Sequence, residues 1–407
     1  MCDTEFFGTK RRQFGDREQI TIPTNGANCG VNETMGRLAG LTFSRGWIPS
    51  HPRFRLRWLA NSDADVPSWI DDDRWVPTGN RALYRRVKDG IRAVLTELDA
   101  DGPVLMPTFI PPGVPATVEE IGLESAFFPV EPTLSVSLDV VRERIEATDP
   151  AVVIVVHYLG LVDPAFPEIR ELTRETGAYL IEDVARGLFS RDADGVLLGS
   201  TGDAALFCVN KTLPGPNGGL IISRETALPS PVDRCPETLD LTREVFRYFM
   251  ANFDTSVLVS DPDEDRDIPV GVPADELLAP GWVSVRGFDG QSPETVQSLR
   301  LALYRDLRER LVDVAPVVTP SAPDGASPYG VGIVTSSGSV RDELYRTLAG
   351  QGLPAEIISW PPNFEEMSTE EGATALRRRL LVIPTHQQVP STAGARIESV
   401  VRDVLAE

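Results

Sequence analysis

Short apolar runs alternate with amphipathic stretches through the middle of the chain. In each run the apolar residues are continuous, which is typical of strands that are buried on both faces of a sheet. The stretches between the runs carry apolar residues at helical spacing and predict helices. The predicted strands are 104–106, 125–130, 151–157, 178–183, 204–209 and 218–223, and the predicted helices are 78–98, 137–147 and 166–177. Because strands that alternate with helices form right-handed crossovers, we expect an α/β domain with a mostly parallel sheet.

The pattern changes after an acidic, proline-rich stretch at 260–273, which is typical of a linker or surface loop. The elements predicted beyond it are a helix over 292–311, a strand near 329–336, a helix over 340–350 and a terminal helix that ends at the last residue. The first 75 residues show little periodicity. The expected organisation is therefore an irregular segment over 1–75, a large domain over 76–260 and a smaller C-terminal α+β domain over 274–407.

Composition narrows the possible partners of the chain. The 407 residues include 39 basic and 60 acidic ones, and the net charge of −21 repels nucleic-acid phosphate and anionic membrane surfaces. We therefore expect no nucleic acid and no membrane as partners. The lysines are Lys10, Lys88 and Lys211 alone, so nearly all positive charge is arginine. An acidic surface poor in lysine suits a salt-rich cytoplasm, and halophily is a hypothesis.

Cysteine and histidine give little support for a metal site. The four cysteines form no C-x-x-C pair and the chain has three histidines, so we expect no bound metal. The N-terminus lacks an apolar signal region, and no stretch of about 18 apolar residues suggests a membrane span. A reduced, cytoplasmic protein is the expectation.

Two residues suggest a cofactor. Asp183 ends a predicted strand in the stretch IEDVARG, where open α/β sheets bind ligands, and Lys211 follows the next strand in the chain. A carboxylate opposite a pyridinium nitrogen, with a lysine that forms a Schiff base, is the minimum apparatus of pyridoxal 5′-phosphate (PLP) chemistry. The cofactor phosphate needs backbone N–H groups at a helix N-terminus. Thr78, Gly79 and Asn80, at the start of the first predicted helix, offer such a place.

Several stretches, in this order, resemble the DegT-type aminotransferases of PLP fold type I, most of which act on nucleotide-linked keto sugars. The stretches that carry the resemblance are TGNRAL (78–83), PTFIPPGV (107–114), VHYLG (156–160), EDVA (182–185), KTLPGPNGG (211–219) and LLVIPTHQQVP (380–390). The resemblance implies a large α/β domain with a smaller C-terminal domain, PLP as the cofactor and a homodimer. It also implies transamination, in which an amino acid such as glutamate or glutamine donates an amino group to a keto group of the sugar.

The same resemblance implies roles for single residues. Lys211 would hold PLP as an internal aldimine and move the proton between substrate and cofactor. Asp183 would keep the pyridine nitrogen protonated, and Ala185 would pack on the ring. The remaining cofactor-side residues would be Thr78, Gly79, Asn80, His157, Arg186, Cys208 and Asn210.

The sequence departs from the family pattern at four places. Arg186 replaces the usual Gln or His, and Cys208 stands where a serine normally contacts the phosphate, so that Asn210 could serve instead. The expected ring-stacking aromatic is absent after Pro107, where Pro111 and Pro112 stand, and the family's G-Y-N-x-R segment has no counterpart.

Other interpretations stay open. Lys211 could be a surface lysine, Asp183 a helix cap and His157 a core histidine, and the arginines at 377–379 suit a solvated face. The enzyme could act on an amino acid without a sugar acceptor. The chain could also be a catalytically silent relative that binds a ligand or a partner chain.

Overall fold

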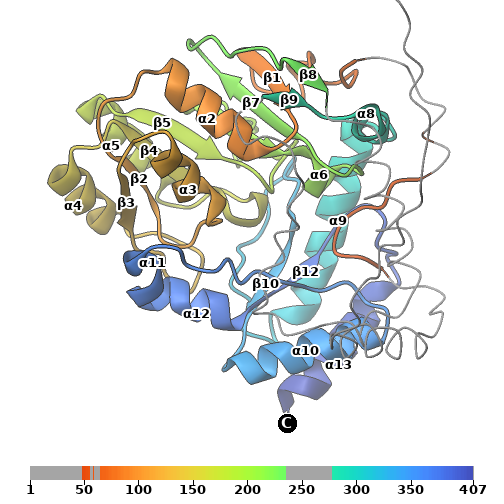
Figure 1. Ribbon diagram of the computed structural model, residues 1–407. Coiled ribbons are helices and arrows are strands. Elements are labelled where there is room, and N and C mark those ends of the chain that lie inside the picture. Colours follow the sequence, from red (N-terminus) through yellow and green to blue (C-terminus); the bar gives the residue numbers. More distant parts are fainter. Residues whose placement is uncertain (1–47, 56–57, 59–64, 235–276, 407) are drawn as a thin grey trace, which may run out of the picture. The chain divides into compact units, whose positions relative to one another are not determined.

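The central sheet has seven strands, which pair antiparallel at one edge and parallel at the other (Figure 1). The computed structural model describes residues 48–55, 58, 65–234 and 277–406. Along the sheet the order is β1-β7-β6-β5-β4-β2-β3, and β7 runs antiparallel to both neighbours while the other pairs are parallel. The bounds are β1 (Asn80–Tyr84), β2 (Val104–Pro107), β3 (Ser125–Phe128), β4 (Val152–Val156), β5 (Tyr179–Asp183), β6 (Ala204–Cys208) and β7 (Gly219–Ser223). The predicted α/β class with a mostly parallel sheet is confirmed.

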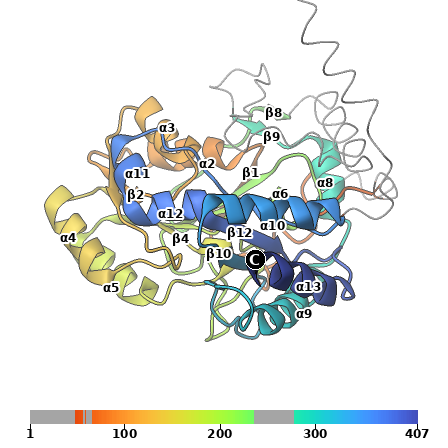
Figure 2. The same cartoon turned by 90° about the horizontal axis from the view of Figure 1, so that it is seen from below.

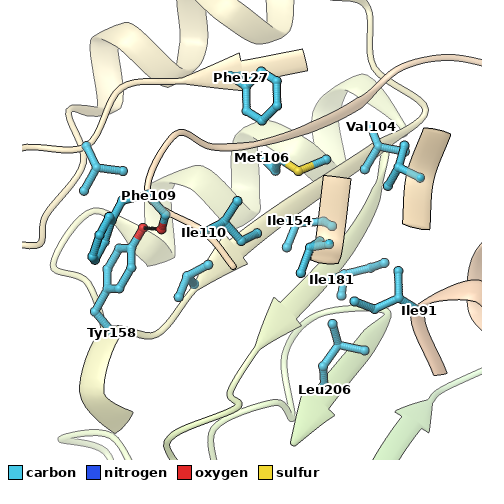
Figure 3. Close-up of a cluster of buried hydrophobic side chains, with 14 of the residues drawn as sticks. Ile91, Val104, Met106, Phe109, Ile110, Phe127, Ile154, Tyr158, Ile181 and Leu206 are labelled. Carbon is cyan, nitrogen blue, oxygen red and sulfur yellow. Dashed lines mark hydrogen bonds between the residues drawn. The ribbon is translucent and has the colours of Figure 1, made fainter. Parts of the chain in front are cut away.

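Helices cover both faces of this sheet, as the continuous apolar strands require. Their bounds are α2 (Val87–Glu97), α3 (Gly113–Glu120), α4 (Leu138–Thr148), α5 (Phe166–Thr176) and the short α6 (Val209–Thr212). All five residues of β4 are buried, and Figure 3 shows Ile154 and Ile181 of adjacent strands together with Ile91 of α2 in one apolar cluster. Burying each such side chain contributes about 1.5–3 kcal/mol, so the sheet and its helices form a single stable support.

The predicted helix over 78–98 is wrong in its first half. Residues Asn80–Tyr84 form β1, the edge strand that pairs with β7, and the helix α2 begins only at Val87. The helical spacing of Val87 and Ile91 belongs to α2, whereas Leu83 and Tyr84 bury their side chains on opposite faces of the sheet, in different clusters. Pairing with the free edge of β7 therefore overrides the apparent helical period.

The C-terminal residues form a second, three-stranded sheet with the order β10-β12-β11. The predicted helices at 292–311 and 340–350 and the terminal helix are confirmed, and α13 packs against both α9 and α10 (Figure 2). The bounds in this part are β8 (Asp233–Arg234), β9 (Leu278–Ala279), α8 (Trp282–Phe288), α9 (Pro293–Leu311), β10 (Gly330–Val334), α10 (Gly338–Gly350), β11 (Glu356–Ile357), α11 (Glu365–Thr369), α12 (Glu371–Arg379), β12 (Leu380–Pro384) and α13 (Ala393–Ala406).

Some expectations fall on residues outside the described ranges. The predicted linker at 260–273 and most of the segment 1–75 lie there, so the three-part division of the chain stays a prediction. Within the described ranges, no helix is long and apolar enough to cross a membrane. The same residues contain no group of three or more histidine, cysteine or acidic side chains that could hold a metal ion.

Candidate functional site

Asp183 and Lys211 line one pocket. Asp183 is the last residue of β5, and Lys211 lies in α6, directly after the neighbouring strand β6. The pocket encloses about 400 Å³, its open mouth included. Its lining residues are Phe109, Pro111, Leu134, Val156, His157, Tyr158, Leu159, Asp183, Ala185, Arg186, Lys211, Ile358, Trp360 and Leu380. Five predicted site residues, His157, Asp183, Ala185, Arg186 and Lys211, are thus brought together.

The carboxylate of Asp183 is buried with one oxygen occupied. Its Oδ1 accepts a hydrogen bond from the backbone N–H of Ala185 at 2.9 Å, and no described residue donates to the other oxygen. Burial raises the pKa of Asp183, and the charges of Lys211, His157 and Arg186 partly oppose this rise. A buried carboxylate with a free oxygen is suited to accept a hydrogen bond from a cationic ring N–H.

Lys211 has a fixed backbone and a free amine. Its carbonyl oxygen accepts a hydrogen bond from Nη2 of Arg300 at 3.0 Å, and Arg300 itself is fully buried. Burial lowers the pKa of Arg300 to about 10, and its Nη1 donates to the carbonyl of Pro328 at 3.3 Å. Within the part of the chain that the structure describes, Nζ of Lys211 makes no hydrogen bond and no ion pair, so the amine is available to a ligand.

Glu182 lies behind the pocket and holds the ring of His157 in place. Alternation along β5 turns its side chain away from that of Asp183, and its Oε2 accepts a hydrogen bond from Nε2 of His157 at 2.8 Å. The N–H and hydroxyl groups of Thr201 donate to Oε1 at 2.8 and 3.0 Å, and Gly202 N–H donates as well. Burial alone would raise the pKa of Glu182, but His157 and these N–H groups lower it to about 2. Sequence analysis missed this role, although a glutamate at the end of an otherwise apolar strand was a signal.

His157 lines the pocket with one nitrogen unused. Because the ionised carboxylate of Glu182 only accepts hydrogen bonds, Nε2 of His157 carries the proton and Nδ1 is left. That Nδ1 is buried and has no partner among the described residues. The ring packs edge-on against Phe166 with centroids 4.6 Å apart, so its orientation is set from both sides.

Arg186 is held by the C-terminal sheet. Nη2 and Nη1 donate to the two oxygens of Glu356 at 2.9 and 3.2 Å, and the guanidinium lies 4.2 Å from the ring centroid of Tyr329. Burial disfavours its charge, yet Glu356 and Tyr329 hold the pKa of Arg186 above its usual range. Its Nε is buried without a partner in the described residues. Arg186 therefore combines a fixed, paired guanidinium edge with a buried Nε donor that no described residue satisfies.

Aromatic and strained residues form the pocket wall. Phe109 is fully buried, and its ring centroid lies 5.9 Å from that of Tyr158 (Figure 3). Its centroid lies 4.7 Å from that of Trp360. Leu134, Leu159 and Trp360 all have positive φ angles of 61°, 56° and 31°. Bulky residues adopt this backbone conformation at a cost of about 1–3 kcal/mol, and such strain concentrates at functional sites.

A close contact between backbones explains two motif glycines. Gly160 of VHYLG has φ 79°, and a Cβ atom there would lie 2.6 Å from the carbonyl oxygen of Arg186. A Cβ atom on Gly187 would lie 2.9 Å from Cα of Gly160. The backbones of the loops after β4 and β5 thus contact each other directly. This contact positions His157 and Asp183 on the same side of the pocket.

The structure does not agree with the predicted phosphate site at Thr78, Gly79 and Asn80. These residues enter β1 beside Ser223, at the end of the sheet opposite Asp183 and Lys211, roughly 13 Å along the strands from that edge. Nδ2 of Asn80 donates to the carbonyl of Thr226 at 3.0 Å, which is a structural role. No helix begins at these residues, so they do not offer the N–H groups of a helix N-terminus to a phosphate.

The N-terminus of α2 lies beside the strand end that precedes Lys211. Gly219 pairs with Cys208 in the sheet, and a Cβ atom on Gly219 would lie 2.5 Å from the backbone nitrogen of Val87. Sγ of Cys208 donates to Oδ1 of Asn210 at 3.3 Å, and both residues are partly exposed beside Lys211 without lining the pocket.

Two further residues lie outside the pocket. His386 is buried, and its Nε2 bonds to the carbonyl of Pro49 at 2.8 Å; burial lowers its pKa to about 3. Arg377 does not form part of a solvated face, as its sequence suggested. It is buried and donates to the carbonyls of Trp360 and Thr108 at 2.9 and 2.6 Å, so it joins the C-terminal part to the pocket wall.

Comparison with known proteins gives one family match and several similar folds. Residues 89–234 match the model of the DegT/DnrJ/EryC1/StrS aminotransferase family, whereas no curated protein sequence gives a significant match. Three similar solved structures show the same fold. They are Helicobacter pylori PseC, an aminotransferase involved in the biosynthesis of pseudoaminic acid (TM-score 0.63, 11% identity, covering 89% of this chain and 100% of that one), DesI in the presence of its TDP-sugar product (0.60, 18%, 91% and 96%), and the aminotransferase TlmJ from Streptoalloteichus hindustanus (0.59, 20%, 80% and 86%). Residues 89–234 are therefore similar to the DegT/DnrJ/EryC1/StrS aminotransferase family, and the chain shares the fold of these solved structures.

Proposed function

We propose that this protein transfers an amino group from glutamate or glutamine to a keto group of a nucleotide-linked sugar. The observation that carries the proposal is the shared pocket of Asp183 and Lys211, at the carboxyl ends of two adjacent strands. The similar structure of DesI with a TDP-sugar product supports the class of acceptor. By family analogy we expect the protein to act as a homodimer in the cytoplasm.

The residues of the pocket fit PLP. Among the described residues, the amine of Lys211, one carboxylate oxygen of Asp183 and two buried nitrogens, Nδ1 of His157 and Nε of Arg186, have no partner. Orphaned polar atoms of this kind are costly unless a ligand satisfies them. The cofactor supplies an electron sink that stabilises negative charge on the reacting carbon.

Each residue then has a defined task. Asp183 would accept a hydrogen bond from the ring N–H of the cofactor and keep that nitrogen protonated, since an ionised carboxylate stabilises an N–H cation. Nζ of Lys211 would take the proton from the α-carbon of the amino donor and deliver it to the adjoining carbon of the cofactor, and the fixed backbone of Lys211 would set its reach. The side chains of Phe109, Tyr158 and Trp360 exclude water from this exchange.

The phosphate end of the site is assigned to the loop around α6 and to the start of α2. The N-terminus of α2 lies against Gly219, which pairs with Cys208, and the N–H groups of the first turn of a helix attract an anion. Asn210 adds a side-chain amide next to Lys211. This replaces the cradle predicted at the other end of the sheet.

A spectroscopic experiment tests the proposal. Purified protein incubated with PLP should show a visible absorbance band that both Lys211→Ala and Lys211→Arg lack, because arginine keeps the charge but cannot form the covalent bond. Borohydride reduction followed by peptide mass analysis should place the cofactor on Lys211. The assay then measures 2-oxoglutarate release from glutamate in the presence of a keto-sugar nucleotide. Labelling of Lys88 instead, or a band that survives in both variants, would contradict the assignment.

A further inference from the structure

Arg186 places a second cation in the pocket that contains the amine of Lys211. Both side chains line the pocket, and the charges of both act on the buried carboxylate of Asp183. Arginine does not lose its proton in proteins. An unbalanced positive charge at this position would therefore favour loss of the proton from the nitrogen of Lys211.

Glu356 balances this charge. It belongs to β11 of the C-terminal sheet, and its two oxygens accept hydrogen bonds from Nη2 and Nη1 of Arg186 at 2.9 and 3.2 Å. Burial alone would raise the pKa of Glu356, but the charges of Arg186 and His51 lower it to about 2. The carboxylate is therefore ionised near neutral pH, and the Arg186–Glu356 pair carries no net charge.

Tyr329 fixes the orientation of this pair. Its ring centroid lies 4.2 Å from the guanidinium of Arg186, and its hydroxyl donates a hydrogen bond to Oε2 of Glu356. In the described part of the chain, the titratable or charged groups that face the pair are Asp183, Tyr329, His51 and Arg300. Because the two hydrogen bonds fix one edge of the guanidinium and the stacked ring fixes its plane, Arg186 has a defined orientation in the pocket wall.

We propose that Glu356 is a positioning residue that acts through Arg186: it fixes the guanidinium and balances its charge, so that the nitrogen of Lys211 retains its proton. This inference rests on the proposed function and makes it more specific, since it names a residue of the C-terminal sheet that sets the charge state of the reacting amine. Protein groups tune the reactivity of a cofactor through the charges that they place beside it. A protonated nitrogen withdraws electrons from the adjoining carbon and so favours attack by the amino donor.

The expected effect follows from the electrostatics of the pocket. At an effective dielectric constant of about 20, an unbalanced unit charge roughly 10 Å away changes a proton equilibrium by about 10-fold, which is one pH unit. Removal of the Glu356 carboxylate alone leaves such a charge on Arg186. Removal of both charges leaves none, so the two kinds of variant should behave differently even though both disturb the same contacts.

A spectroscopic pH titration tests this inference. In Glu356→Gln the charge of Arg186 is unbalanced, whereas the double variant Arg186→Gln, Glu356→Gln is neutral like the wild-type pair. The visible band of the PLP-loaded protein is followed as a function of pH. We expect the midpoint of its change to fall by about one pH unit in Glu356→Gln. The double variant, the conservative Glu356→Asp and the control Glu171→Gln, which breaks an exposed pair, should keep the wild-type midpoint.

A labelling measurement on the cofactor-free protein separates this inference from the proposed function. Only an unprotonated amine reacts with acetic anhydride, so at a fixed pH near neutrality Lys211 should be acetylated about 10-fold faster in Glu356→Gln than in the wild type. Peptide mass analysis gives the rate at Lys211, and the rate at Lys88, which does not line the pocket, serves as the internal reference. The double variant should react at the wild-type rate.

The outcomes decide between charge and packing. An unchanged midpoint and an unchanged acetylation rate in Glu356→Gln overturn the inference, and so does an equal shift in the double variant, because such a shift does not depend on the charge of Arg186. If Glu356→Gln does not fold, Arg186→Gln replaces it, and the unbalanced carboxylate, which His51 and Tyr329 still stabilise, should raise the midpoint; an unshifted midpoint there overturns the inference. Absence of any visible band in the wild type overturns the proposed function, and the acetylation rates still decide the role of Glu356.

Discussion

The guanidinium of Arg186 and the carboxylate of Glu356 form a buried, two-point ion pair at 2.9 and 3.2 Å. Arg186 belongs to the loop that follows Asp183, the last residue of β5, and Glu356 belongs to β11 of the C-terminal sheet. Tyr329 joins them, since its ring lies under Arg186 and its hydroxyl donates to Glu356 and also contacts Nε2 of His51 at 3.1 Å. The loop after β5 is therefore fixed by Glu356, a residue that lies 170 positions later in the chain than Arg186.

Removing one partner of this pair should strongly destabilise the protein. Arg186→Gln leaves the Glu356 carboxylate buried without its cation, and we expect the free energy of unfolding to fall by about 3–5 kcal/mol. Urea denaturation at pH 7 measures the change. The control is Arg174→Gln, which breaks the exposed Arg174–Glu171 pair and should leave the urea midpoint unchanged. Equal midpoints for the two variants would show that the buried pair contributes nothing to stability.

Stability should fall in acid through Glu182 and Glu356. Burial alone would raise both pKa values, but His157 in one case and Arg186 in the other lower each to about 2, against 4.5 for a free glutamate. A carboxylate with a lowered pKa in the folded state stabilises it above pH 4.5, and this contribution is lost as the pH falls from about 4.5 to about 2. Urea unfolding between pH 7 and pH 3 should show the decline.

The variant Glu182→Gln tests how much of the loss of stability in acid is due to Glu182. The variant should be less stable at pH 7, because Thr201 and Gly202 lose an ionised acceptor, and its stability should depend less on pH below 4.5. An unchanged pH profile in this variant would mean that other carboxylates cause the decline.

Asp183→Asn should separate stability from function. Burial raises the pKa of Asp183, so its ionised form opposes folding above its usual pKa, and the amide should increase the free energy of unfolding of the cofactor-free protein near neutral pH. The amide oxygen can still accept the Ala185 N–H bond. An amide cannot balance a charged ring nitrogen, however, so kcat should fall by about 100- to 1000-fold. Thermal unfolding and transamination rates measured on one preparation test both parts, and a variant that is less stable and fully active would contradict both.

The limits of sequence analysis can be traced to particular residues. The continuous runs of β4 and β5 identified the sheet, and the position of Asp183 and Lys211 after adjacent strands was enough to bring them together. The pairing of Arg186 with Glu356 depends on a contact over 170 residues, which no local pattern encodes. The segment 80–84 was predicted as the start of a helix, and only its pairing with the free edge of β7 shows that it is a strand.

A matched pair of asparagine variants tests where the cofactor phosphate binds. Asn80 and Asn210 were both predicted to surround the phosphate, but they lie at opposite ends of the sheet. Asn210→Ala should raise the apparent Kd for PLP by roughly 10-fold, because a hydrogen bond to a charged group contributes about 1.5–3 kcal/mol. Asn80→Ala should leave this Kd unchanged and cause only a small loss of stability, since its amide bonds to the carbonyl of Thr226. Fluorescence titration with PLP measures both constants. If only Asn80→Ala weakened PLP binding, the phosphate would bind at the start of β1, and its placement beside α2 would be wrong.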